Sequence, residues 1–153
     1  MGGPSVNVDI DLSQILDFID EWNKIGVLKV LQRASLALQA ELVKEAPVDT
    51  GRLRGSIQAP QQKTENQFLL PINAKYWTAI QFGTGIHGPE GKPFDIYPKK
   101  GKVLRFEVKG ETVFAKFVKD HPGQKPNPFF DRAFDNIEPK IGDFVQDIIE
   151  RLL

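Results

Sequence analysis

A long apolar stripe at helical spacing most restricts how this chain folds. The stripe consists of Leu28, Leu31, Ser35, Leu38 and Leu42. These residues lie at positions i, i+3, i+7, i+10 and i+14, so they share one face of a helix. The pattern stops at Pro47, because proline disfavours helical geometry in the residue before it. We therefore expect a helix over residues 27–46 that buries one face against another element.

The residues before this helix predict an arm and a shorter helix. Residues 1–10 are rich in Gly, Pro and Asp and weakly apolar, so we interpret them as a flexible N-terminal arm. Asp11, followed three residues later by Gln14, resembles a capping box that opens a helix. Residues 23–26 predict a break or bend, since Gly inside a helix costs about 1 kcal/mol relative to Ala.

The rest of the chain alternates short strand patterns with helical ones. A turn leading into a strand is expected over 48–57. The further expected elements are strands at 57–60 and 67–72 around a polar turn at 61–66, a short helix at 74–82, an irregular loop at 84–101, a β-hairpin of 103–108 with 112–118, a second loop at 121–127 and a C-terminal helix over 128–152.

This order of elements predicts an α+β fold. We expect a small, mostly antiparallel sheet packed against the long N-terminal helix and the C-terminal helix. The length of 153 residues fits one domain, which we place at 11–153 after the arm.

Composition and charge exclude several classes of protein. Twenty Lys and Arg balance 20 Asp and Glu, which removes the bulk attraction to phosphate of a dedicated nucleic-acid binder. The absence of cysteine excludes disulfide scaffolds, cysteine-ligated metal and thiol nucleophiles. No apolar run reaches the length of a membrane span, and the start lacks a signal-peptide pattern. We therefore expect the protein to be cytosolic in the cell that makes it.

Residues with catalytic chemistry are few. His87 and His121 each lie in a Gly/Pro-rich loop without an acidic or histidine partner at helical spacing, so we expect no metal and no cofactor. A hydrolase built on Asp49, Ser56 and His121 would require these side chains to converge within hydrogen-bond reach. Turn formation alone explains Asp49, Thr50 and Gly51, which we expect to fix the turn after the long helix.

Two further patterns have both a functional and a structural interpretation. Residues 83–88 match G-x-G-x-x-G, but they follow a helical pattern and open no helix, so we interpret them as a flexible loop. Tyr76, Trp77 and Phe82 resemble a platform on which bases stack, although aromatic residues at helical spacing are more often core.

Basic residues form the remaining candidate interaction site. In an extended segment Arg52 and Arg54 would lie on one side, where they could bind a phosphate or a partner's carboxylate. Ion pairs within this chain or with a neighbouring subunit are an equal alternative. Together with Lys99, Lys100 and Lys102 they define an alternative function, a nucleic-acid-binding module whose affinity would fall steeply with salt.

Three segments together resemble a known family. They are residues 46–56 (APVDTGRLRGS), 76–84 (YWTAIQFGT) and 121–133 (HPGQKPNPFFDRA), with a helix before the first and a helix after the third. In this order they resemble the HK97 gp10-like family of tailed-phage proteins, the tail-completion or head-tail joining components. The resemblance covers roughly residues 27–152.

The resemblance implies a non-enzymatic virion protein, assembled in the host cytoplasm. Such a subunit would form a homo-oligomeric ring in the neck, between the head connector or adaptor and the tail terminator or tail-tube proteins. DNA would pass through its lumen without being specifically bound, and no membrane is involved. Loop 83–101 would contact ring neighbours or the tail.

The layout of charge is compatible with such a ring. Net charge is −3 over residues 1–30, +2 over 31–83, +4 over 84–130 and −3 over 131–153. A ring needs a surface that meets a different surface of the next copy. A basic loop-and-hairpin region and acidic helical ends could form that pair, or they could be solvated faces or pair within one subunit.

Overall fold

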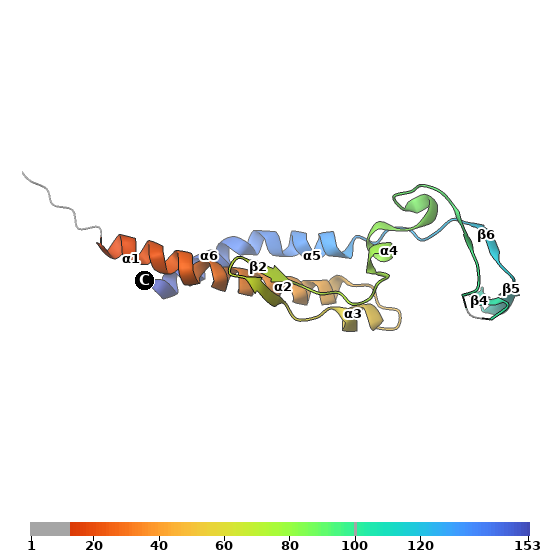
Figure 1. Ribbon diagram of the computed structural model, residues 1–153, viewed down its shortest axis with the longest axis horizontal. Coiled ribbons are helices and arrows are strands. Elements are labelled where there is room, and N and C mark those ends of the chain that lie inside the picture. Colours follow the sequence, from red (N-terminus) through yellow and green to blue (C-terminus); the bar gives the residue numbers. More distant parts are fainter. Residues whose placement is uncertain (1–12, 100) are drawn as a thin grey trace, which may run out of the picture. The chain divides into compact units, whose positions relative to one another are not determined.

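The computed structural model describes residues 13–99 and 101–153. The expected N-terminal arm (1–10) and the cap at Asp11 lie outside these residues. The α+β class is confirmed, with a long N-terminal helix, a C-terminal helix and small antiparallel sheets (Figure 1). Among the residues that the structure describes, the antiparallel strand pairs form three separate two-stranded sheets.

The described chain groups into two compact units, which the chain enters more than once. The first comprises the described part of Met1–Glu41 with Gln58–Pro71 and Phe134–Leu153, and the second comprises Leu42–Ile57 and Ile72–Ala133. The prediction of a single domain over 11–153 stays a prediction.

The first unit is built on helices. Its elements are α1 (Ser13–Glu21), the π-helical turn η1 (Trp22–Gly26), most of α2 (Val27–Glu45), the hairpin β1 (Gln61–Thr64) and β2 (Gln67–Leu69), the end of α5 (Phe129–Ile137), the 3-10 turn η3 (Glu138–Lys140) and α6 (Ile141–Leu152). The expected bend at 23–26 is the π-helical turn, through which the helix continues into α2. Helix α6 packs against this turn.

Arg33 joins α2 to α6 in the first unit. Its guanidinium donates to the Asp147 carboxylate at 2.6 Å and lies 4.7 Å from the centre of the Phe144 ring. Helix α2 and the β1–β2 hairpin face each other across a groove of about 440 Å³, which Leu31, Leu38 and Phe68 help to line. The apolar stripe predicted for α2 therefore does face other elements of the fold.

The second unit holds the other elements. These are the end of α2, α3 (Arg52–Ser56), α4 (Trp77–Phe82), the 3-10 turn η2 (Gly85–His87), β3 (Phe94–Ile96), β4 (Leu104–Val108), β5 (Glu111–Ala115), β6 (Val118–His121) and the start of α5. Strand β3 pairs with β6, and β4 pairs with β5. The fully buried residues at its core are Leu42, Ala46, Phe129 and Ala133.

Several local expectations hold and several are wrong. The predicted hairpin is confirmed as β4–β5, turning at Lys109 and Gly110, which both have positive φ. Residues 61–64 form strand β1 in place of the expected turn, and the loop 84–101 contains η2 and β3. The C-terminal helix is interrupted by η3, because Pro139 lacks the amide hydrogen that a continuous helix needs.

The strand expected after the first turn is also wrong. Gly51, at φ +74°, turns the chain directly into the short helix α3, and only Ile57 makes a bridge, to Ile72. Leu53 and Ile57 lie four residues apart, and both are buried. Arg52 and Arg54 are two residues apart on a helix, so they do not share the one side that an extended segment would give them.

Candidate functional site

The end of α2 is held by an arginine from the first motif. Arg54 donates from Nε to the carbonyl oxygen of Ala46 at 3.0 Å and from Nη2 to that of Lys44 at 3.1 Å. The last carbonyl groups of a helix have no intrahelical partner and carry partial negative charge. Arg54 therefore caps α2 within its own chain.

A second arginine joins the third motif to the same helix end. Arg132 Nε donates to the Glu45 carboxylate at 2.8 Å, and Nη2 donates to the Glu45 carbonyl at 3.4 Å and to Asn127 Oδ1 at 2.8 Å. The Glu45 side chain is 22% exposed, so this pair is less screened by water than a fully exposed one. The first and third motifs thus meet at the C-terminal end of α2.

The loops of the second and third motifs interlock through backbone groups and the Thr84 hydroxyl. Thr84 N donates to Gln124 O, Ile86 N donates to Pro122 O and Gln124 N donates to Thr84 Oγ1, each at 2.9 Å. We call residues 83–86 and 122–124 the clasp. A Cβ atom on Gly123, which has φ +87°, would lie 2.1 Å from Thr84 O, so glycine is required for this approach.

A buried glutamine fixes α4 to α5. Gln81 is 3% exposed, and its Oε1 accepts a hydrogen bond from Phe130 N at 3.0 Å, near the start of α5. Asn127 N donates to Ile80 O at 2.7 Å, and the rings of Trp77 and Phe130 lie 6.5 Å apart. Sequence reasoning missed Gln81, because no local pattern reveals that its side chain satisfies a backbone amide 49 residues later.

The three motifs also line one cleft of about 470 Å³. Its polar side chains come from Asp49, Thr50, Arg52, Tyr76 and Gln124. Gly51 belongs to the lining as well, so the predicted turn residues and Arg52 are brought together here. The other predicted arginine, Arg54, is instead engaged on α2.

The three residues of the hydrolase hypothesis are not brought together. Ser56 Oγ donates to the carbonyl of Leu53 at 2.7 Å, and His121 Nδ1 accepts from Gly123 N at 3.0 Å. Asp49 lines the cleft, whereas His121 lines a separate cavity of about 320 Å³. Within residues 13–99 and 101–153, no hydrogen bond joins any two of these three side chains, and no cluster of His, Asp and Glu could hold a metal ion.

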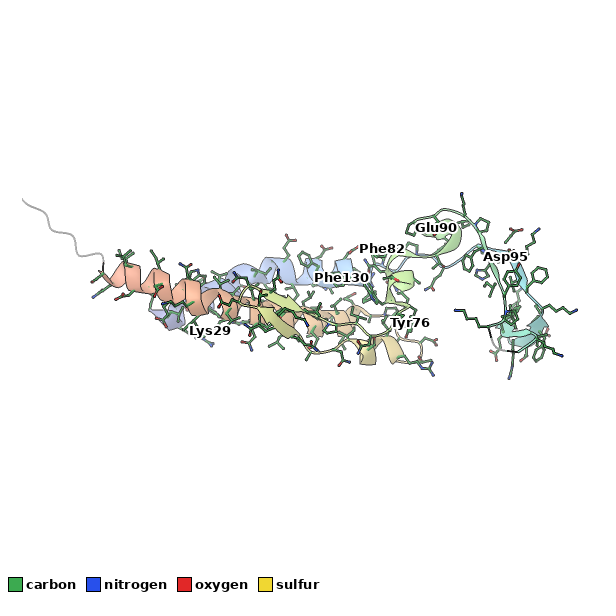
Figure 2. All side chains as sticks on the ribbon, in the orientation of Figure 1. Lys29, Tyr76, Phe82, Glu90, Asp95 and Phe130 are labelled. Atoms are coloured by element: carbon green, nitrogen blue, oxygen red, sulfur yellow. The ribbon has the colours of Figure 1, made fainter. Side chains whose placement is uncertain are left out.

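The predicted aromatic platform is divided among different surroundings. Trp77 packs on Phe130, and Tyr76 lines the cleft. Phe82, a residue that is 53% exposed, lines another cavity of about 450 Å³. Tyr76, Phe82 and Phe130 are labelled in Figure 2. The G-x-G-x-x-G segment contains the 3-10 turn η2, and its Gly83 and Gly85 approach the opposite loop of the clasp closely.

Residues 86–121, which we call the arm loop, run from one side of the clasp to the other and carry the remaining basic candidates. Lys99 and Lys102 are exposed, and Lys100 lies outside the described residues. The Tyr97 and Phe117 rings stack at 5.9 Å. The Tyr97 hydroxyl donates to Asp95 at 3.2 Å, and this hydrogen bond and the negative carboxylate raise the pKa of Tyr97 (Asp95 is labelled in Figure 2).

None of the helices in the described residues is both long and apolar enough to cross a membrane. Comparison with models of known families, with curated proteins and with solved structures found no match to this chain.

Proposed function

We propose that this chain is a structural subunit of the neck of a tailed phage. In this proposal it is a tail-completion or head-tail joining protein, not an enzyme, and it forms a ring between the head connector or adaptor and the tail terminator or tail-tube proteins. The observation that carries the proposal is the interlocking of the three motifs by the clasp, Arg54, Gln81 and Arg132.

These contacts use polar groups to build a scaffold. Arg54, Ser56 and His121 all make hydrogen bonds inside the second unit, which leaves them engaged in structure. A ring subunit needs such a rigid base for the surfaces that meet its neighbours. The arm loop carries a net positive charge and residues 131–153 carry a net negative charge. Complementary charge would help to set the register of a contact between different faces of successive copies.

Electron microscopy tests this proposal. We expect rings in concentrated purified protein or in the neck of virions, and we expect purified protein to restore joining when it is added to separated heads and tails that lack it. The double variant K99E/K102E should weaken ring formation more than the charge-matched control K63E/K75E. Isolated monomers in every assembly context, with no density in the neck, would rule the proposal out.

A second candidate function is a nucleic-acid-binding module. It is favoured by the exposed Lys99 and Lys102 close in sequence to the stacked rings of Tyr97 and Phe117. Arg54 would contribute little, because its guanidinium is held by α2. A gel-shift assay decides: this function requires binding at low salt that falls steeply as salt rises and that K99E/K102E reduces. No shift at low salt excludes it.

A further inference from the structure

The arm loop contains two sheets with an apolar cavity between them. The cavity measures about 320 Å³ and is lined by Ile96 of β3, Leu104, Arg105 and Phe106 of β4, and Val118 and His121 of β6. Four of these side chains are aliphatic or aromatic hydrocarbons. The site therefore suits a ligand that offers apolar groups.

The strands beside this cavity have open edges. In the described part of the chain, β4 hydrogen-bonds to β5 alone, and β3 hydrogen-bonds to β6 alone. An edge strand presents unpaired backbone N–H and C=O groups, which readily accept a further strand. The cavity and the open edge of β4 together favour an extended peptide as the ligand.

The sequence of this chain contains a segment with the matching pattern. Between Val6 and Leu12 it reads VNVDIDL, so apolar residues alternate strictly with polar ones. Such alternation is typical of a strand with one buried and one exposed face. Residues 6–12 lie outside those that the structure describes, and this step uses only their sequence.

The alternation along the two strands also brings opposite charges to the same face. Leu104 and Phe106 share one face of β4, and Arg105 projects to the other. If the apolar residues of the segment share the face of Leu104 and Phe106, Asp9 and Asp11 share the face of Arg105. Opposite charges on neighbouring strands stabilise their pairing, and a shift of one residue would lose both matches.

We propose that residues 6–12 of one copy add as a strand to the open edge of β4 in a neighbouring copy. The apolar side chains enter the cavity, and Asp9 or Asp11 pairs with Arg105. The segment is assigned to a neighbour because the proposed ring needs a surface of one copy that meets a different surface of the next. This inference rests on the proposed assembly of several copies and names the surface through which they are linked.

Cysteine cross-linking tests the contact, since the chain has no cysteine of its own. Two single variants, each of the full chain, are mixed and oxidised: I10C or V8C with F106C. Side chains opposite each other on paired strands are close enough for a disulfide. We expect a covalent dimer on a non-reducing gel, at least about tenfold more than with the control F114C, which lies on the far strand β5.

Each outcome decides the proposal. A dimer specific to F106C supports it. A double variant that carries I10C and F106C in one chain is the comparison. If the disulfide forms only within that chain and not between the single variants, the segment belongs to its own copy and the proposal is overturned. Equal cross-linking to F114C, or no product up to the solubility limit, overturns it as well.

A second measurement follows assembly without cysteines. V8D/I10D places two charges on the apolar face of the segment, and S5D/N7D places two on the polar side. We expect the first variant to weaken self-association at least about tenfold relative to the second in analytical ultracentrifugation. Rings that persist with V8D/I10D would remove this inference while leaving the proposed function intact, whereas an absence of rings in the unmodified protein would remove the function.

Discussion

The clasp makes a sharp prediction for Gly123→Ala. The added Cβ would lie 2.1 Å from Thr84 O and 2.7 Å from Gly85 N, so the two loops must separate. Separation loses the three hydrogen bonds of the clasp, each with a net value of about 1 kcal/mol. The left-handed backbone at φ +87° adds about 1 kcal/mol for a residue with a Cβ atom. We therefore expect the free energy of unfolding to fall by about 4 kcal/mol.

Gly110→Ala is the matched control. Gly110 has the same φ of +87°, but a Cβ atom there would meet nothing within 4 Å. This variant should lose only the backbone contribution, about 1 kcal/mol. In thermal unfolding followed by circular dichroism, the Tm of Gly123→Ala should lie about 6–12 °C below that of Gly110→Ala. Equal losses in the two variants would show that the close approach at the clasp contributes nothing to stability.

Two further predictions concern other parts of the chain. In the first unit, a Cβ atom on Gly26 would lie 2.4 Å from the Trp22 ring, whereas one on Gly142 in α6 would meet nothing within 4 Å. In urea unfolding we expect Gly26→Ala to be destabilised, and Gly142→Ala to be stabilised by about 0.5–1 kcal/mol. A stabilised Gly26→Ala would contradict this prediction. In a Tyr76→Phe background, Asp95→Asn should lower the pKa of Tyr97, because the hydroxyl loses its hydrogen bond to the carboxylate and the phenolate loses a negative neighbour. A pH titration followed by tyrosinate absorbance measures the pKa of Tyr97, and an unchanged titration midpoint would refute the assigned cause.

Elements with a strong local pattern could be predicted from the sequence. Helix α2 follows from the stripe that ends at Leu42, and the β4–β5 hairpin follows from strand patterns on either side of Lys109 and Gly110. Helix α3 escapes prediction because Asp49, Thr50 and Gly51 indicate a turn but do not specify the element after it. The spacing of Leu53 and Ile57 is a helical signal that could have corrected this. The interruption at Pro139 escapes prediction because the apolar repeat continues through it.

The candidate site was less accessible to sequence reasoning. The glycines around Thr84 and the glycine before Gln124 predict two separate loops, because nothing in either segment indicates that its backbone pairs with the other. In an extended segment, Arg52 and Arg54 would lie on one side and be available to partners, whereas Arg54 is held by the end of α2. Long-range pairing of backbone groups leaves only the glycines as evidence in the sequence, and glycine has many other uses.

The clasp has a consequence for how this chain can vary. It joins Thr84 to Gln124, 40 residues apart, so the chain leaves for the arm loop and returns from it at the same place. The entropic cost of closing a loop grows slowly, by about 0.6 kcal/mol for each doubling of its length. A longer or shorter loop can therefore replace the arm loop while the residues of the clasp stay unchanged. If the arm loop contacts partners, as the proposed function expects, recognition of those partners can then change independently of stability.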